Sequence, residues 1–366
     1  MNGKKLIVSV VVCAAFAAGI YFAHARWFGS RVNSRESLLR SLPADAGAVI
    51  YLDVAESRQA TILQDFSALD RGAAVDQDYK QFISETGFDY QKDLDRIGIA
   101  IHTAGATTQY FALVDGKFDR KKIEAYLRKS GTSETKNGLE IFHLSGSLQH
   151  RRAVSAAFIS NERIAFSDED DLNSEIESGR SGPGHAEWTE RFSRLAGSPI
   201  FTLIRQDAAI GAILSAQAPG GFRSPQLAQL LNQLLWISIA AKPEGSGFRV
   251  VAEGECPNEM TMRQLGDFLN GITLLAQGGL NDPKLRQQMD PAERDAYVQL
   301  LNSVDVTRLD RGRSKSVRLS AVITPETLER VAKAQPITAP HEIAPPTKNA
   351  APTKKKAENQ PQPVKR

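Results

Sequence analysis

The most prominent pattern along the chain is an uninterrupted apolar run close to its start. Residues 6–25 contain no formally charged side chain and consist mainly of Val, Ala, Ile and Phe. A helix of about twenty residues spans roughly 30 Å, which matches the hydrocarbon core of a bilayer. We therefore predict that residues 1–31 comprise a single membrane anchor and its flank. The anchor side chains are Leu6, Ile7, Val8, Val10, Phe16, Ile20, Tyr21, Phe22 and Trp27.

A cleaved signal peptide is the alternative interpretation of this run. Lys4 and Lys5 fit a basic n-region, and Ala23-His24-Ala25 fits a small-x-small cleavage pattern. The run exceeds a signal core of roughly 7–15 residues, which favours a retained anchor. Arg26, Arg31, Arg35 and Arg40 outnumber the two lysines before the run, which opposes the positive-inside rule, but long downstream domains are translocated largely regardless of charge. We expect a single-pass protein of the inner or plasma membrane with its body outside the cytoplasm, in the periplasm.

Short β-rich runs bounded by turn residues dominate the rest of the chain, after a polar linker at 32–46. Each run has the alternation or the enrichment in branched and aromatic residues that is typical of strands. Close spacing between neighbouring runs permits antiparallel pairing and excludes a parallel crossover between them. We predict strands at 48–53, 97–103, 110–115, 139–144, 154–159, 163–166, 200–204, 235–241, 248–253, 304–309 and 317–323.

Helical periodicity separates these strands. Asp119 has the residue type of a helix cap, and Gly87 and Gly131 suit the ends of two helices. Ser224-Pro225, Asp282-Pro283, Asp290-Pro291 and Thr324-Pro325 each have the Pro that the first turn of a helix tolerates. We predict helices at 62–69, 79–86, 119–131, 168–178 and 207–216, and helices that begin near residues 225, 258, 283, 291 and 325.

The order of these elements repeats once along the body. One and the same spacing separates Ile97 from Leu235, Tyr110 from Phe248 and Asp119 from Pro257. We predict an α+β fold with two similar halves that arose by duplication, each a mostly antiparallel sheet with helices on one face. The predicted segments are a first half at 47–178, a linker at 179–197, and a second half at 198–335 with a helical insertion at 279–302.

The two ends of the chain carry its basic charge. Residues 1–31 have a net charge of +4 and residues 341–366 also +4, so the body retains 35 basic and 40 acidic side chains. This net charge of −5 makes nucleic acid an improbable partner of the body. Residues 336–366 hold seven prolines and no aromatic residue, which predicts a disordered tail. Its expected contacts with an anionic lipid or polymer are Lys354, Lys355, Lys356, Lys365 and Arg366.

No arrangement of residues in the sequence predicts a metal, a cofactor or a catalytic centre. Cys13 lies in the apolar run and Cys256 in the body, which excludes an internal disulfide framework. His102 follows small residues on one face of its strand and is a candidate titratable group. The acidic run Ser167–Asp171 is better explained by capping of the helix that follows it than by calcium. The Gly-rich stretch 179–184 matches neither a nucleophile elbow nor a phosphate loop and is typical of a linker.

Several phrases resemble a bacterial family of unknown function that is anchored by one N-terminal helix. They are Leu42-Pro43-Ala44-Asp45-Ala46 followed by the strand at 48–53, Gly87-Phe88-Asp89, Asp93-Leu94-Asp95-Arg96-Ile97, and Ala165-Phe166-Ser167-Asp168. The resemblance implies an envelope protein with an α+β body. It implies no activity and provides no functional residues.

The sequence therefore favours a non-catalytic binding or scaffolding module of the cell envelope, held at the membrane and in contact with an envelope protein. One alternative is an extracytoplasmic hydrolase whose site uses scattered residues such as His102 or Asp53. Another is an anchor that faces the cytoplasm and binds nucleic acid through its tail.

Overall fold

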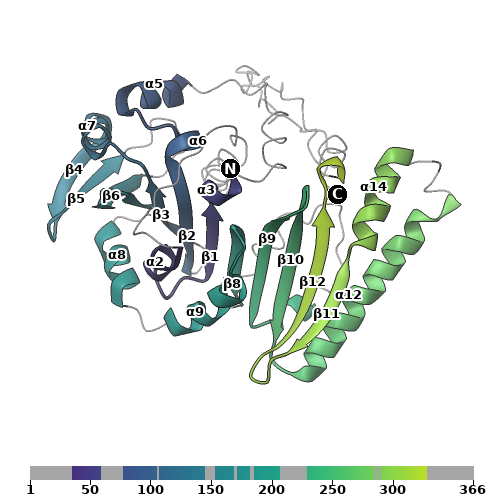
Figure 1. Ribbon diagram of the computed structural model, residues 1–366. Helices are drawn as coiled ribbons and strands as arrows, with labels where there is room; N and C mark the ends of the chain where they lie inside the picture. Colours follow the sequence, from purple (N-terminus) through teal and green to yellow (C-terminus); the bar gives the residue numbers. More distant parts are fainter. Residues whose placement is uncertain are drawn as a thin grey trace, which may run out of the picture.

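A single antiparallel sheet of twelve strands forms the centre of the fold (Figure 1). The computed structural model describes residues 35–58, 77–104, 107–144, 153–168, 171–181, 185–206, 229–283, 287 and 290–327. The spatial order of the strands is β11-β12-β10-β9-β8-β1-β2-β3-β7-β6-β5-β4. The strands are β1 (Ala48–Asp53), β2 (Leu94–Ala104), β3 (Thr107–Gly116), β4 (Thr132–Lys136), β5 (Leu139–Leu144), β6 (Val154–Ser160), β7 (Arg163–Ser167), β8 (Ile200–Arg205), β9 (Trp236–Glu244), β10 (Gly247–Cys256), β11 (Asp305–Asp310) and β12 (Lys315–Ile323).

Helices cover both faces of this sheet, so the prediction of helices on one face is wrong. In the first half, Leu38 of α2 lies against Gly98 on one face, whereas Ile123 of α7 packs with Ile164 on the other. In the second half, Leu265 of α12 lies against Gly254 on the face opposite α2. Both faces need cover because strands such as β1 carry apolar side chains in both directions. The described helices are α2 (Arg35–Arg40), α3 (Val54–Ser57), α5 (Gln77–Thr86), α6 (Tyr90–Asp93), α7 (Arg120–Ser130), α8 (Leu172–Ser181), α9 (His185–Arg194), α12 (Glu259–Leu280) and α14 (Pro291–Asn302).

Two of these helices lie in segments that we predicted as linkers, 32–46 and 179–197. The side chain of Leu38 in α2 is fully buried, and the buried Trp188 of α9 belongs to the same core cluster. The Trp188 indole N–H donates to the Ala44 carbonyl oxygen at 3.0 Å. Both segments are therefore parts of the core, and α2, α8 and α9 lie together over the central strands in Figure 1.

The first strands of the two predicted halves pair with each other, which joins everything into one sheet. β1 is antiparallel to β8, with Tyr51 opposite Phe201 and their rings stacked at 5.0 Å between centroids. Outward from this seam the order is β1-β2-β3-β7-β6 on one side and β8-β9-β10-β12-β11 on the other. The hairpin β4–β5 is additional on the first side, and α14 follows α12 on the second.

The strand registers refine the constant spacing that the sequence predicts between the halves. Asp115 in β3 lies opposite Arg163 in β7, and Glu253, at the predicted spacing from Asp115, lies opposite Arg318 in β12. Ile101 of β2 pairs with Tyr110, and Pro243 of β9 pairs with Phe248, so Pro243 is the residue that corresponds to Ile101. The sequence separation of Ile101 and Pro243 is larger than the predicted spacing. The β2–β3 hairpin is longer, so the spacing is not constant across the three elements.

Several described helix ends follow the predicted chemistry. The side chain of Asp119 accepts the N–H of Lys122 at the start of α7, and that of Asn258 accepts the N–H of Thr261 at the start of α12. Gly87 ends α5 with a positive φ of 72°, a conformation that glycine adopts without strain. α14 begins at Pro291, as the insertion pattern predicts.

The predicted anchor at 1–31, the helices at 62–69 and 207–216, and the tail at 336–366 lie outside the described residues. Among the helices that are described, none combines the length and the apolar character needed to cross a bilayer.

Candidate functional site

A row of side chains with alternating charge crosses four neighbouring strands of the first side of the sheet, on the face covered by α2. Asp53, Arg96, Asp115 and Arg163 lie opposite one another in turn on β1, β2, β3 and β7. Arg163 donates to both Asp115 carboxylate oxygens, at 2.6 and 2.9 Å, and their side chains are only 7% and 4% exposed. Arg163 also donates to the Ser41 hydroxyl at 3.2 Å, which lies just after α2. This ion pair is therefore enclosed within the protein.

The corresponding pair on the second side of the sheet is reachable from solvent. The Glu253 carboxylate accepts from Arg311 at 2.6 Å, from Arg318 at 2.8 Å and from the Ser316 hydroxyl at 2.8 Å. Glu253 is buried, but the side chains of Arg311 and Arg318 are 30% and 37% exposed. Burial would raise the pKa of Glu253, but these hydrogen bonds outweigh it, and the pKa lies below its ordinary value.

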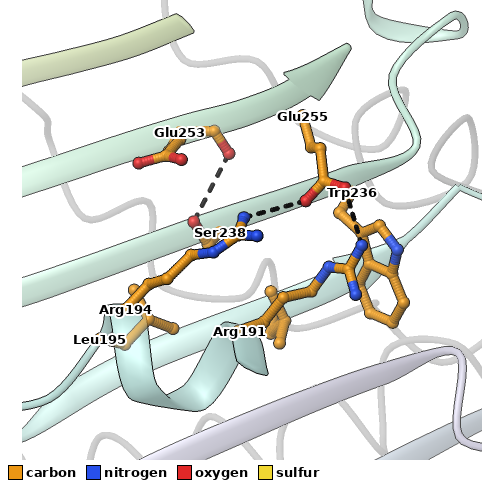
Figure 2. A pocket seen from close by; sticks show the side chains of 8 residues that line it. Arg191, Arg194, Leu195, Trp236, Ser238, Glu253 and Glu255 are labelled. Carbon is orange, nitrogen blue, oxygen red and sulfur yellow. Dashed lines mark hydrogen bonds and ion pairs between the residues drawn. The ribbon is translucent and has the colours of Figure 1, made fainter. Parts of the chain in front are cut away.

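A second carboxylate on the same face of β10 binds two arginines of α9. Glu255 accepts from Arg191 at 2.8 Å and from Arg194 at 3.1 Å. The guanidinium of Arg191 lies 4.1 Å from the centre of the Trp236 ring, a cation–π contact that Figure 2 shows from close by. Between these side chains and Ser238 is a hollow of about 20 Å³, enough for roughly one water molecule.

We refer to Arg191, Arg194, Arg311 and Arg318 as the arginine face. An arginine side chain keeps its proton at any physiological pH, so these four groups do not act as general acids or bases. Guanidinium groups instead bind planar carboxylates and phosphates through pairs of parallel hydrogen bonds. The arrangement is suited to recognition of an anion. In the described part of the chain, no three His, Cys, Asp or Glu side chains gather as a metal site would require.

The residues proposed from sequence for a hydrolase do not come together. Asp53 accepts from the Tyr51 hydroxyl at 3.1 Å and from Arg96 at 3.0 Å, and it also caps α3. His102 lies six residues beyond Arg96 on β2, about 20 Å away at roughly 3.3 Å per residue. Its ring nitrogens lie 3.5 Å from Glu175 and 3.8 Å from Asp45. His102 and Asp53 therefore belong to separate polar contacts.

The remaining sequence motifs have structural roles. Asp171, rather than Ser167, accepts the N–H of Ser174 in the first turn of α8. Gly179 lies within α8, and a β-carbon there would be 2.2 Å from the Ser41 carbonyl oxygen. Gly245 has a positive φ in the tight turn that joins β9 and β10 as a hairpin. Tail residues Lys354, Lys355, Lys356, Lys365 and Arg366 lie outside the described residues.

Sequence reasoning missed the arginine face because α9 lay in a predicted linker. Two local signals were present. Glu187 and Glu190 precede Arg191 and Arg194 by four residues, a spacing typical of ion pairs along one face of a helix. Glu253 and Glu255 alternate along β10, which places both carboxylates on one face of the sheet.

Replacing Glu253 by Gln should make the protein less stable at neutral pH, by about 2 kcal/mol, because charged hydrogen bonds are lost. The folded-state pKa of Glu253 is lowered, so its contribution exists above the ordinary value of 4.5 and disappears as pH falls through the folded value. Urea unfolding of both proteins from pH 7 to pH 3 should show the difference shrinking below about pH 4.5. A constant difference at every pH would contradict this assignment.

Cys256 should react very slowly with iodoacetamide in the folded protein. Burial, together with the neighbouring Glu255 charge, raises the pKa of its thiol to about 11. At pH 8 about 0.1% of such a thiol is the reactive thiolate. Mass spectrometry of a Cys13→Ser variant should show labelling at least about 100-fold faster after unfolding in urea. An exposed Glu134→Cys on β4 serves as the control, and equal rates at 134 and 256 would refute this prediction.

Comparison with known proteins shows a distant similarity of fold. No family model and no curated protein matches the chain. The structure is similar to crystal form IV of TP0453, with 10% identity, a TM-score of 0.42, and coverage of 80% of this chain and 95% of that one. For crystal form III the corresponding values are 9%, 0.43, 83% and 100%. For crystal form I they are 10%, 0.39, 84% and 99%.

Proposed function

We propose that this protein is a membrane-anchored, non-catalytic binding module of the cell envelope, with its body outside the cytoplasm and the arginine face as its contact surface. The apolar run at 6–25 is the proposed anchor, and an envelope protein is the proposed partner. The lysine-rich tail is proposed to touch an anionic lipid or polymer beside the membrane.

The observation that supports the binding surface is the contrast between the two corresponding ion pairs. Asp115 and Arg163 are closed off, whereas Arg318 and Arg311 around Glu253 are about one-third exposed. An ion pair that only stabilises the core does not need access to solvent, so the exposure of Arg311 and Arg318 supports a role in binding. Arginine is also among the residues that most often dominate the energy of protein interfaces.

A duplication of the body, which we also propose, would explain this contrast. The strand order outward from the β1–β8 seam, the shared Asp115–Arg163 and Glu253–Arg318 register, and the helices α2 and α9 before each first strand support it. One copy would then have kept the closed pair as part of its core. The other copy would have opened it for binding.

Site-specific crosslinking tests the contact surface. A photoreactive amino acid at Ser193, exposed on α9 next to the arginine face, should crosslink an envelope protein in intact cells. The same group at Met260, exposed on the opposite face, should not. Adding Arg194→Gln should weaken the crosslink from position 193. Equal crosslinking from positions 193 and 260, or hydrolytic turnover by the purified full chain, would contradict the proposal.

Thiol labelling tests the orientation. A Glu134→Cys, Cys13→Ser variant should react with a membrane-impermeant maleimide in cells whose inner membrane is intact. Labelling only after that membrane is broken would place the body in the cytoplasm and exclude the proposed location.

A further inference from the structure

The buried part of the arginine face holds more positive than negative charge. Four guanidinium groups, those of Arg191, Arg194, Arg311 and Arg318, surround the two buried carboxylates of Glu253 and Glu255. The two carboxylates are two residues apart on one strand, or about 7 Å. Such a surplus of cations in a partly buried place attracts an anionic partner more strongly than the same charges would on an open surface.

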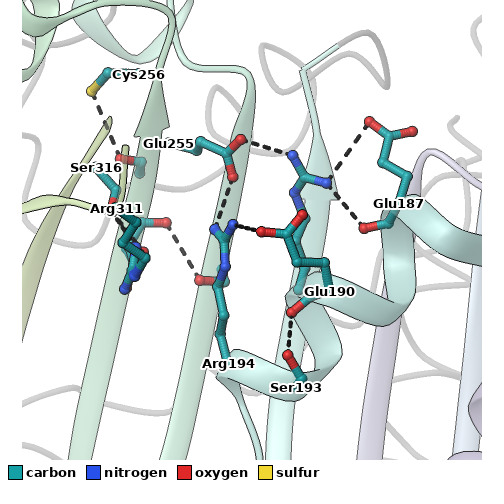
Figure 3. Close-up of polar contacts among 12 residues, drawn as sticks. Glu187, Glu190, Ser193, Arg194, Glu255, Cys256, Arg311 and Ser316 are labelled. Carbon is teal, nitrogen blue, oxygen red and sulfur yellow. Dashed lines mark hydrogen bonds and ion pairs between the residues drawn. The ribbon is translucent and has the colours of Figure 1, made fainter. Parts of the chain in front are cut away.

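Two further glutamates, Glu187 and Glu190, balance this charge from the solvent side. Arg194 donates to Glu190 at 2.5 Å, and Arg191 lies 3.8 Å from Glu187 while donating to its backbone carbonyl at 3.0 Å. Figure 3 shows Glu190 beside Arg194 and Glu187 farther from Glu255. The side chains of Glu190 and Glu187 are 67% and 50% exposed. The arginine side chains are only 11% and 16% exposed, so solvent and a partner reach them from the side that the two glutamates occupy. Helical pairs of this spacing contribute only about 0.3–0.5 kcal/mol, so another carboxylate can replace the exposed glutamates readily.

We propose that the arginine face binds a segment of acidic peptide through its carboxylates, and that Glu187 and Glu190 hold the outer donor atoms of Arg191 and Arg194 until that segment replaces them. This inference rests on the proposed function, because it gives the chemistry of the partner. Carboxylate is the group that these arginines already bind, in four glutamates. An extended peptide with acids at alternate positions repeats the spacing of Glu253 and Glu255.

Binding of a fluorescent octaglutamate peptide to the full-length protein in detergent tests this. Glu190→Gln should tighten binding about three-fold, because it removes the competing carboxylate. Arg194→Gln should weaken it about ten-fold, because a charged hydrogen-bonding partner is lost. Higher salt should weaken binding in every variant. A merely structural ion pair would not give tighter binding when Glu190 is removed.

Glu259 and Arg263 of α12 provide matched controls. They form an exposed pair of the same spacing at 2.5 Å, on the opposite face of the sheet. Glu259→Gln and Arg263→Gln make the same charge changes and should leave octaglutamate binding unchanged. If the Glu259 and Arg263 variants change octaglutamate binding as much as the Glu190 and Arg194 variants do, net charge alone attracts the peptide and the inference is wrong. The inference is also wrong if a polyphosphate of equal charge binds more tightly than octaglutamate. If crosslinking from position 193 persists in those cases, the proposed function stands, and if it also fails, both are refuted.

Discussion

Replacing Asp115 by Ala is expected to lower the free energy of unfolding by about 3–5 kcal/mol. The substitution leaves Arg163, which is only 7% exposed, without its counter-charge. The Ser41 hydroxyl, at 3.2 Å, is a neutral group and does not compensate for a buried cation. In a protein of this size, the loss corresponds to a fall in Tm on the order of 10 °C. Thermal unfolding of the full chain in detergent, followed by circular dichroism, measures it.

The second side of the sheet offers the matched comparison. Arg318→Ala removes one partner of Glu253 but leaves Arg311 and Ser316 in place, and Arg318 is 37% exposed. We expect a loss of about 1 kcal/mol, the scale of a solvated pair. A double replacement, Asp115→Leu with Arg163→Leu, should cost less than Asp115→Ala because no buried charge remains. If Asp115→Ala and Arg318→Ala lower Tm equally, the enclosed and open pairs are not energetically different.

The strands were predictable because their signal is local. The run 48–53 is β-branched and aromatic, and it forms β1 with the predicted bounds. Helix caps at Asp119 and Asn258 are equally local, since a short polar side chain three residues before a free N–H is enough. The anchor and tail stay predictions, because they lie outside the described residues.

The joining of the sheet was not predictable, because it depends on contacts between distant segments. Tyr51 and Phe201 stack across the β1–β8 seam although they belong to opposite halves of the chain. The six-residue helix α2 is too short to show a helical period, and its role follows only from the contact of Leu38 with Gly98.

The candidate site was hidden for the same reason. Arg191 binds Glu255 from 64 positions away, and Arg311 binds Glu253 from 58 positions away. Ion pairs over such separations leave no spacing pattern in one sequence. The sequence marked His102 and Asp53 as candidates because single residue types are easy to see, and the fold places them about 20 Å apart.

Trp188→Ala is expected to be the most damaging single change in α9, with a loss of about 3–5 kcal/mol. The indole is buried, lies edge-on to Trp236 at 4.8 Å between centroids, and donates its N–H to the Ala44 carbonyl oxygen. The Trp188 side chain thus links the segment before β1 to β9. Its removal leaves a cavity and leaves the Ala44 carbonyl oxygen without this hydrogen bond. Urea unfolding at pH 7 measures the loss.

Glu187→Ala on the same helix is the control, since that side chain is 50% exposed and should shift the unfolding free energy by less than about 0.5 kcal/mol. Trp236 belongs to the second side of the sheet and Ala44 to the first, so Trp188→Ala should also weaken the connection between them. Labelling of Cys256 should then begin at a lower urea concentration than the loss of total secondary structure. Simultaneous transitions with an unchanged midpoint would mean that the segment 179–197 is the linker that its sequence suggests.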